Sequence, residues 1–196
     1  LIKEIVNKPQ GIFFVTGPTG SGKSTLLFAC LNHILHKDIN ITTIENPIEY
    51  KIEGITQVQV NEKAGLTFAR ALRSILRQDP DVILIGEIRD PETAGIAVQA
   101  AQTGHLVLAT LHTNDAVAAV TRLKDLTIAP FLISSSLLAI AGQRLVRTLC
   151  PRCKIKTPFS ENQKSVWIKN FGDDVKFPPF YYKSAGCKNC GQSGYT

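Results

Sequence analysis

A nine-residue stretch early in the chain has the composition and spacing of a phosphate-binding loop. Its glycines let the backbone curl so that successive N–H groups can point inward at phosphate oxygens. The stretch follows the apolar run 11–16 and precedes the apolar run 26–31, so it would join a strand to a helix. A surface turn rich in glycine and serine is the alternative, which this context disfavours. The residues that fit G-x-x-x-x-G-K-[ST] are Gly17, Pro18, Thr19, Gly20, Ser21, Gly22, Lys23, Ser24 and Thr25.

The motif predicts that the chain binds a nucleoside triphosphate together with Mg²⁺. Lys23 would reach the β- and γ-phosphates, and the Ser24 hydroxyl would hold the magnesium ion. The helix expected over 24–36 would add the partial positive charge and the unpaired amides of its N-terminus. These features need a strand in front of the loop and a helix behind it, and the sequence supplies both.

Acidic residues follow the next segment that has strand character. Residues 41–44 are β-branched throughout, which predicts a strand, and the chain then passes through Glu45 and Glu49. In open parallel sheets, ligands lie beyond the carboxyl ends of the strands. The two carboxylates are therefore candidates for positioning the water that attacks a phosphate. A solvated acidic turn is the alternative, and the pattern alone does not exclude it.

Two more strand-like runs end in residues that could act on a nucleotide. Residues 82–85 form a continuous apolar run that ends at Gly86 and Glu87, the arrangement of an acid that acts on Mg²⁺ or on water in phosphate-loop ATPases. Residues 105–112 form another buried run with a histidine at each end. A fully extended strand would separate His105 from His112 by roughly 23 Å, so both cannot touch the same phosphate. The carboxyl-end rule assigns His112 to the nucleotide edge.

Three arginines fall on one face of the helix expected over 66–78. Arg70, Arg73 and Arg77 are spaced at i, i+3 and i+7. An arginine beside a nucleotide can supply positive charge to the transition state, often across a subunit boundary. A solvated helix face is an equally good interpretation of the spacing alone.

Four of the five cysteines form two C-x-x-C pairs near the end of the chain. The pairs are Cys150 with Cys153 and Cys187 with Cys190, and residues 154–186 lie between them. Four thiolates with basic neighbours suit a closed tetrahedral zinc site, which would contribute folding energy and leave no open position for chemistry. Disulfides or a redox pair are the alternatives. The fifth cysteine and the nucleotide motif favour a reducing compartment, where disulfides are disfavoured.

Composition describes an ordinary globular chain with one α/β domain and a small appendage. The 196 residues are 44% hydrophobic and 19% charged, and no apolar run reaches the ~18 residues of a membrane span. We attribute the net charge of +6 to nucleotide phosphates and scattered solvated faces, in preference to nucleic acid or an anionic membrane. The absence of methionine predicts a fragment of a longer protein. Helices are also expected over 1–10, from Asp90 to Gly104, from Asn114 or Asp115 to about 126, and over 131–143, with a short strand over 57–60.

Taken together, these segments resemble the hexameric ATPases of type II secretion and type IV pilus assembly. The resemblance covers nearly the whole chain, and motifs of this length in this order are very specific. Asn46 is one departure, because the family usually has aspartate there. The segments that carry the resemblance are Gly17–Thr25, Thr43–Tyr50, Leu72–Asp90, Thr103–Thr113 and Gln143–Arg147.

The resemblance implies a role for each site residue. Glu49 would polarise the attacking water, and Glu87 would hold Mg²⁺ through water or assist Glu49. Arg73 and Arg77 would contact the γ-phosphate in the same subunit or across the subunit interface, and His112 would sense that phosphate. If the acid usual at position 46 helps to bind Mg²⁺, Asn46 would weaken hydrolysis.

The resemblance also implies the architecture and the partners. We expect a RecA-like ATPase core over 1–147, with a central parallel sheet flanked by helices, and a truncated zinc-stapled subdomain over 148–196. The family's N-terminal domain would be missing. The protein would form a cytoplasmic homo-hexamer, associate peripherally with an inner-membrane platform protein, and bind no nucleic acid. The tetracysteine insert disfavours a pilus-retraction motor. The alternatives are a regulatory subunit that binds ATP with little hydrolysis and, less well supported, a DNA-linked motor.

Overall fold

The computed structural model describes residues 1–196 except 37, 173–175 and 177. The chain divides into two compact units, Leu1–Leu145 and Val146–Thr196. Each unit is described by itself. In the described part of the chain, no helix has the length and apolar composition needed to span a bilayer.

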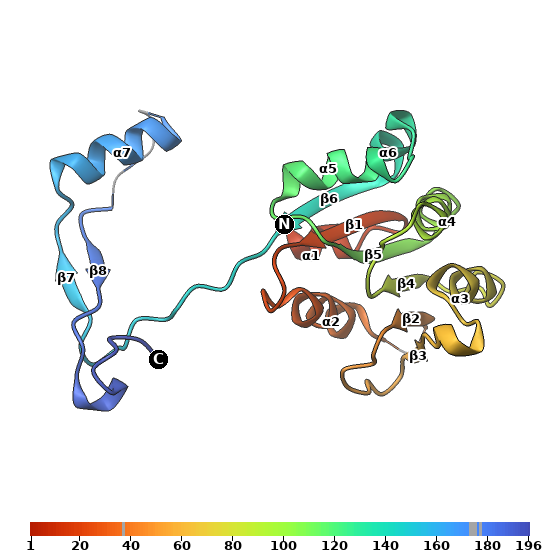
Figure 1. The fold of residues 1–196 in the computed structure, drawn as a ribbon, viewed down its shortest axis with the longest axis horizontal. Coiled ribbons are helices and arrows are strands. Elements are labelled where there is room, and N and C mark those ends of the chain that lie inside the picture. Colours follow the sequence, from red (N-terminus) through yellow and green to blue (C-terminus); the bar gives the residue numbers. More distant parts are fainter. Residues whose placement is uncertain (37, 173–175, 177) are drawn as a thin grey trace. The chain divides into compact units, whose positions relative to one another are not determined.

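The first unit is built on a six-stranded sheet in the order β3-β2-β4-β5-β1-β6 (Figure 1). Every neighbouring pair of strands runs parallel, so the carboxyl ends of all six strands emerge at one edge. The strands are β1 (Gly11–Thr16), β2 (Ile41–Glu45), β3 (Thr56–Gln59), β4 (Val82–Ile85), β5 (Leu106–Leu111) and β6 (Leu137–Gly142).

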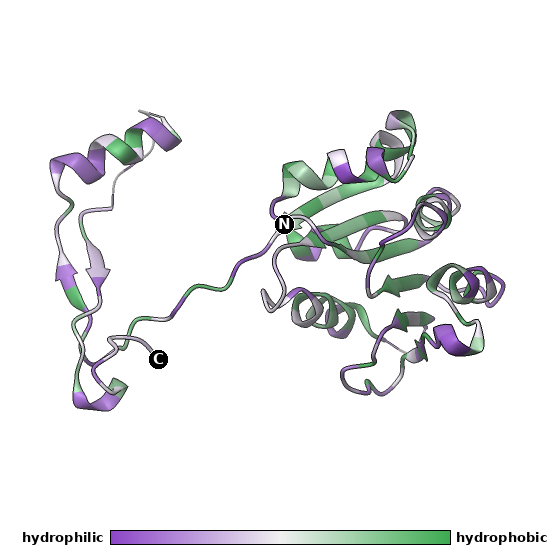
Figure 2. Ribbon diagram, viewed as in Figure 1, coloured by the Kyte–Doolittle hydropathy of each residue, from purple (hydrophilic) through white to green (hydrophobic). Residues whose placement is uncertain are grey.

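Helices cover both faces of this sheet, as expected for an α/β fold with a parallel sheet. On β1, for example, Ile12 and Phe14 pack into one apolar cluster and Phe13 and Val15 into another. The first cluster includes side chains of α3, α4, α5 and α6, and the second includes side chains of α1 and α2. Strand β4 is wholly apolar and β1 and β5 are nearly so, because both of their faces are covered (Figure 2). By contrast, β2 has the sequence Ile-Thr-Thr-Ile-Glu, and the edge strand β3 is mostly polar and partly exposed. The helices are α1 (Ile2–Val6), α2 (Lys23–Ile34), α3 (Phe68–Ile75), α4 (Pro91–Gln102), α5 (Ala116–Asp125) and α6 (Pro130–Ser136), and η1 (Glu62–Ala64) is a 3-10 turn.

Local signals fix where several helices begin. The Asp90 side chain accepts a hydrogen bond from Thr93 N at 2.8 Å and caps α4, with Pro91 at the first helical position. Asp115, rather than Asn114, caps α5 and accepts a hydrogen bond from Ala118 N at 2.7 Å. Both starts agree with the sequence-based expectation.

The prediction of a helix over 131–143 is wrong for the second half of that range. Helix α6 ends at Ser136, and Leu137–Gly142 forms β6, which pairs in parallel with β1. A short apolar run is compatible with either a buried helix or a strand. Here the backbone groups of β1 find partners on both sides only if this run is extended, and that pairing decides its conformation.

The second unit is a small antiparallel ribbon followed by turns. Strands β7 (Ile155–Thr157) and β8 (Tyr181–Lys183) pair, and helix α7 (Glu161–Phe171) lies between them in the sequence. A 3-10 turn, η2 (Lys188–Cys190), carries the second cysteine pair. Aromatic rings pack together near α7, with Phe159 5.9 Å from Trp167 and 5.0 Å from Tyr181 between ring centroids.

The two ends of the second unit meet. Leu149 and Tyr195 form an antiparallel bridge, Cys150 N donates a hydrogen bond to Gly194 O at 3.0 Å, and Thr196 N donates one to Thr148 O at 2.9 Å. The unit therefore closes on itself next to its cysteines.

Formal charge is divided unequally between the units. Residues 1–145 contain 13 lysines and arginines and 13 aspartates and glutamates, so their charges cancel. Residues 146–196 contain nine basic and three acidic residues and carry the whole net charge of +6. The excess positive charge is thus outside the unit that holds the phosphate-binding loop, contrary to our attribution of part of it to nucleotide phosphates.

Candidate functional site

The predicted phosphate-binding loop connects β1 to α2, as the motif requires. Gly20 and Gly22 adopt φ of 76° and 84°, and Gly22 is the N-cap of α2. Glycine is favoured at both positions because other residues rarely adopt positive φ. Lys23 Nζ donates hydrogen bonds to the carbonyl oxygens of Gly17 and Pro18, each at 3.0 Å. The loop thus curls around its own lysine.

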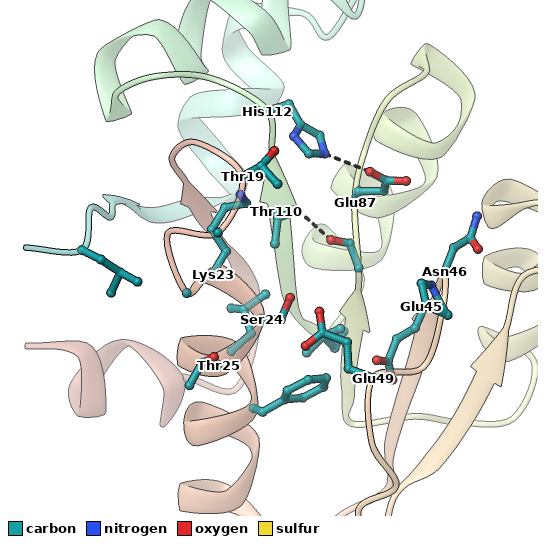
Figure 3. A pocket seen from close by; sticks show the side chains of 18 residues that line it. Thr19, Lys23, Ser24, Thr25, Glu45, Asn46, Glu49, Glu87, Thr110 and His112 are labelled. Atoms are coloured by element: carbon teal, nitrogen blue, oxygen red, sulfur yellow. Dashed lines mark hydrogen bonds and ion pairs between the residues drawn. The ribbon is translucent and has the colours of Figure 1, made fainter.

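A cavity of about 570 Å³ opens beside this loop and brings most of the predicted residues together. It lies at the edge of the sheet where β2, β4 and β5 end. Figure 3 shows the loop and α2 on one side and the acidic residues on the other. The polar or charged side chains that line it are Thr19, Lys23, Ser24, Thr25, Glu45, Asn46, Glu49, Glu87, Thr110 and His112.

Glu87 is held by two basic side chains. Its Oε2 accepts from His112 Nε2 at 2.9 Å and from Arg89 Nε at 2.7 Å, and its side chain is only 14% exposed. His112 follows β5, so neighbouring strand ends place the acid and the histidine together. Arg89 was not among the predicted site residues. The only signal for it was a basic residue two positions after the acid.

The neighbouring backbone also fixes the position of Glu87. Thr110 Oγ1 donates to Gly86 O at 2.6 Å and ties the end of β4 to β5. A Cβ at Gly86 would lie 3.2 Å from Ile44 O, a tight contact with the backbone of β2. Glycine at this position therefore lets the ends of β2 and β4 approach closely.

The two acids that follow β2 have different surroundings. Glu45 is 4% exposed, and its Oε1 accepts hydrogen bonds from Thr43 Oγ1 at 2.6 Å and from Gln57 Nε2 at 2.9 Å. Glu49 is exposed on the loop after β2, and its side chain extends toward α2 (Figure 3). Asn46 is also exposed at the cavity. The geometry thus separates a fixed buried acid from an acid that solvent and ligand can reach.

The back of the phosphate-binding loop rests on the segment that follows β6. Gln143 N donates to Thr16 O at 2.8 Å, and Gln143 Nε2 donates to Gly22 O at 3.2 Å. A Cβ at Gly17 would lie 2.2 Å from Gln143 O. On the other side, Thr16 Oγ1 lies 2.5 Å from Thr113 Oγ1 and links the loop to the residue after His112. Sequence reasoning assigned no site role to Thr16 or Gln143.

Two predicted arginines do not reach the cavity. Among the described residues that line it, neither Arg73 nor Arg77 occurs. Arg73, at the end of α3, forms an ion pair with Glu92 of α4 at 2.5 Å, and both side chains are more than half exposed. His105 lies at the opposite end of β5, with Nδ1 3.0 Å from Ala100 O. In the described structure, Arg73 and Arg77 are therefore not placed to contact a nucleotide bound in the cavity of the same chain.

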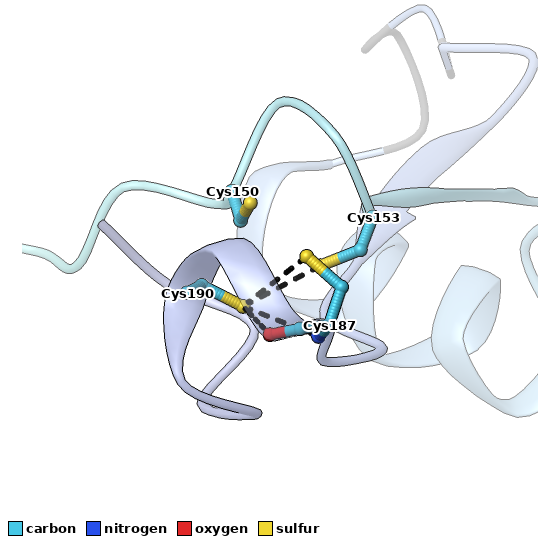
Figure 4. Close-up of side chains that lie close together, drawn as sticks. All are labelled: Cys150, Cys153, Cys187 and Cys190. Carbon is cyan, nitrogen blue, oxygen red and sulfur yellow. Dashed lines mark hydrogen bonds between the residues drawn. The ribbon is translucent and has the colours of Figure 1, made fainter.

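The four paired cysteines of the second unit converge on one point (Figure 4). Their sulfur atoms all lie within 4.8 Å of one another, with Cys190 Sγ 3.8 Å from Cys153 Sγ and 3.7 Å from Cys187 Sγ. The cluster is an arrangement that can bind a metal ion. The fifth cysteine, Cys30, is buried in α2 of the first unit and is not a member of this cluster.

The surroundings of these sulfurs favour the thiolate at two of the four positions. Burial opposes ionisation of Cys190, but N–H donors from Cys187 at 3.3 Å and Gly194 at 3.2 Å lower its pKa to about 6. A backbone hydrogen bond at Arg152 lowers the pKa of Cys150. Burial raises the pKa of Cys153 to about 11. A bound cation would have to stabilise the thiolate of Cys153 in particular.

The whole chain, residues 1–196, matches the family model described as "Type II/IV secretion system protein". Its relatives include type II secretion system protein E of Aeromonas hydrophila, which is 55% identical over 195 residues covering 100% of this chain and 38% of the relative. The type IV pilus assembly ATPase PilB of Thermus thermophilus is 53% identical over 194 residues, covering 98% of this chain and 22% of PilB. The chain therefore spans well under half the length of these relatives.

Solved structures show the same fold. The pilus retraction motor PilT with bound ADP superposes with a TM-score of 0.69 and 42% identity, covering 79% of this chain and 46% of PilT. The VirB11 ATPase of Brucella suis gives a TM-score of 0.58 at 24% identity, over 72% of this chain and 46% of VirB11, which supports the fold alone.

Replacing Gly17 with alanine should weaken the binding of magnesium nucleotide. The new Cβ would lie 2.2 Å from Gln143 O, and φ of 146° is unfavourable for alanine. We expect the Kd for a fluorescent ADP analogue to rise at least about tenfold, since misplaced amides lose phosphate contacts worth more than about 1.4 kcal/mol. Gly95→Ala in α4, where the added Cβ has no neighbour within 4 Å, is the control and should keep its affinity. Equal affinities of the two variants would contradict the tight packing of the loop.

Proposed function

Because the chain belongs to the family of type II/IV secretion system proteins, we propose that it is the ATP-hydrolysing motor domain of a machine that extends a type IV pilus or a type II secretion pseudopilus. One observation carries the proposal. Lys23, Ser24, Glu49, Glu87 and His112, which come from four separate strand ends, line one cavity. These are the groups that phosphoryl transfer to water requires: phosphate ligands, a magnesium ligand and acids that act on the water.

The phosphate-binding loop would bind the nucleotide. Its backbone amides and the N-terminus of α2 would bind the phosphates. Lys23 would exchange its bonds to the Gly17 and Pro18 carbonyls for bonds to the β- and γ-phosphates. Ser24 would hold Mg²⁺, which when bound neutralises the charge that develops on the transferring group.

Two acids that line the cavity would act on the attacking water in different ways. Glu49 is exposed at the cavity, which suits a group that polarises water. Glu87 is fixed by Arg89 and His112, which suits a group that holds the hydration shell of Mg²⁺ or assists Glu49. His112 already contacts Glu87. If His112 senses the γ-phosphate, its movement toward that phosphate would directly change the hydrogen bonding of Glu87.

Arg73 and Arg77 would act on the site of a neighbouring subunit. They are absent from the described lining of their own cavity, and the Arg73 side chain is 51% exposed and forms an ion pair with the exposed Glu92. Ion pairs of this kind contribute little to stability, so breaking one to reach a phosphate costs about 1 kcal/mol or less. This role requires an oligomer, and we propose the homo-hexamer that the sequence resemblance implies.

The cysteine cluster would hold a structural zinc ion. Four sulfurs at about 2.3 Å from zinc in a tetrahedron lie about 3.8 Å apart. The distances of 3.7 and 3.8 Å around Cys190 fit this geometry. With all four positions filled by protein, zinc would contribute folding energy rather than catalysis.

The architecture proposed around this site follows the family. The ATPase core would comprise residues 1–147 and the zinc subdomain residues 148–196, within a protein that also has an N-terminal domain. The motor would work in the cytoplasm, associated peripherally with a platform protein of the inner membrane, and would not require nucleic acid. The names of the relatives, type II secretion system protein E and type IV pilus assembly ATPase, support this proposal.

Substituting Glu87 with glutamine should stop turnover while preserving nucleotide binding. In the full native protein, we expect kcat for ATP to fall at least about 100-fold, the usual contribution of a positioned acid or base. The Kd for ADP should stay within about threefold, because the phosphate-binding loop is unchanged. Steady-state hydrolysis should be measured over a range of protein concentrations, with the exposed Glu62→Gln as the matched control.

Two results would argue against the motor. Unchanged turnover of the Glu87→Gln variant would contradict the catalytic role of Glu87. A wild-type specific activity that does not rise with protein concentration would contradict the proposal that hydrolysis depends on oligomer formation.

Asn46 provides the test between a motor and a regulatory subunit that binds ATP with little hydrolysis. If the motor assignment is right, the wild-type protein hydrolyses ATP, and Asn46→Asp raises kcat by less than about tenfold, or 1.4 kcal/mol. Tight ATP binding without turnover in the wild type, with turnover restored by Asn46→Asp, would establish the regulatory subunit. Single-turnover kinetics on both proteins distinguishes the two.

Removing metal should unfold the second unit and leave the first intact. We expect one zinc ion per chain by elemental analysis, and its removal by a chelator should make residues 146–196 protease-sensitive while ADP affinity persists. Apparent zinc affinity should weaken as pH falls, more steeply below about pH 6, because Cys190 then also binds a proton that the metal must displace. A chain that contains no zinc and stays protease-resistant would contradict the assignment.

A further inference from the structure

The side chain of Gln57 in β3 holds the loop that carries Glu49. We propose that Gln57 is a positioning residue for the attacking-water site, an inference that rests on the proposed ATP hydrolysis. Gln57 is not among the described residues that line the cavity. Its effect would come through the backbone of residues 46–52, which join β2 to the turn before β3.

Gln57 makes three hydrogen bonds with its side-chain amide. Nε2 donates to Glu45 Oε1 at 2.9 Å and to Tyr50 O at 3.1 Å, and Oε1 accepts from Ile52 N at 2.8 Å. Both N–H donors of the amide and one acceptor site of its oxygen are thus in use. One side chain fastens the last residue of β2 and two points on the following loop.

The chemistry of these partners allows only one orientation of the amide. A carboxylate and a carbonyl face Nε2, and both can only accept hydrogen bonds. A backbone N–H faces Oε1 and can only donate. Turning the amide over would set oxygen against two oxygens and N–H against N–H, so the site requires glutamine in this orientation.

Glu49 lies between fastened positions of the loop. On its N-terminal side, Ile48 N donates to Gln59 Oε1 at 3.3 Å. On its C-terminal side, the Tyr50 carbonyl is held by Gln57, and the Tyr50 ring meets the Phe28 ring of α2 edge-on with centroids 4.6 Å apart. Because Glu49 is exposed and its own position depends on the loop backbone, these contacts set where its carboxylate can lie.

Gln57 also links the exposed acid to the buried one. The same Nε2 that holds the Tyr50 carbonyl donates to Glu45, which is 4% exposed. A buried carboxylate needs such donors, since an ion left without them in the interior is costly. Gln57 therefore connects the end of β2 to the loop that carries Glu49.

This arrangement predicts a loss of rate without a loss of binding. The groups that would bind the nucleotide are the amides of the loop between β1 and α2 together with Lys23 and Ser24 at the start of α2. Gln57 instead acts on the loop after β2, at the opposite wall of the cavity. Displacing a reacting group by about 1 Å can lower the rate about 100-fold. The test is Gln57→Met in the full native protein, which keeps the side-chain length and removes all three hydrogen bonds.

For Gln57→Met we expect kcat to fall at least about tenfold, with KM and the Kd for ADP within about threefold of wild type. Amide hydrogen exchange in residues 46–52 should accelerate about tenfold, since the Ile52 amide loses its acceptor. Gln57→Glu should lose at least as much kcat, because it sets a second carboxylate against Glu45 and the Tyr50 carbonyl. Gln99→Met and Gln99→Glu, at an exposed position of α4, are the matched controls.

The exchange measurement keeps this inference separate from the proposed function. Unchanged exchange in residues 46–52 of Gln57→Met, or a kcat within twofold of wild type, would overturn the positioning role. A parallel loss of kcat, ADP affinity and thermal stability would also overturn it, because that pattern indicates a general structural role. The two proposals can also fail separately. If Gln57→Met accelerates exchange but the wild-type protein hydrolyses no ATP, Gln57 still holds the loop in place and the proposed motor function is wrong.

Discussion

The parallel direction of all six strands is the constraint on which the rest of the first unit depends. Strands that run the same way end at the same edge, so residues distant in sequence meet there once the sheet forms. The phosphate-binding loop follows β1, Glu45 ends β2, and Glu87 and His112 follow β4 and β5. The cavity is thus a product of sheet topology, and each strand needs only one suitable residue at its end.

Many of the residues at this edge of the sheet could be predicted, because the sequence patterns that identify them are local. The phosphate-binding loop, the apolar strand before Glu87 and the proline and aspartate at the start of α4 are each encoded within a few consecutive residues. Supporting contacts were not predictable in the same way. Gln143 reaches the loop only because β6 pairs with β1, and Gln57 reaches Glu45 only because β3 pairs with β2. Such partners are set by tertiary structure, so neither composition nor periodicity singles them out.

The sequence was also ambiguous where one pattern fits two environments. Residues 137–142 could be helical or extended, and the open edge of β1 determined the outcome. Glu45 and Glu49 were equivalent candidates by spacing, yet burial makes one a fixed member of the sheet and the other accessible. Neither distinction exists before the chain folds.

The second unit follows a different physical principle. Among its described residues, Cys150 is the single hydrophobic side chain that is fully buried, whereas the first unit has two extensive apolar clusters. A unit of this size cannot bury enough apolar surface to be stable by itself and usually needs a metal or covalent links. Its convergent cysteines provide that support.

The closure of the second unit at residues 148–150 and 194–196 has a consequence for how such proteins can evolve. Because residues 148–150 are paired with residues 194–196, the segment between them is a cassette whose two ends lie side by side. Cassettes of this kind can be spliced into a surface loop, exchanged or deleted without stretching the host on either side. One ATPase framework can thereby be equipped with different appendages while its own sheet remains unaltered.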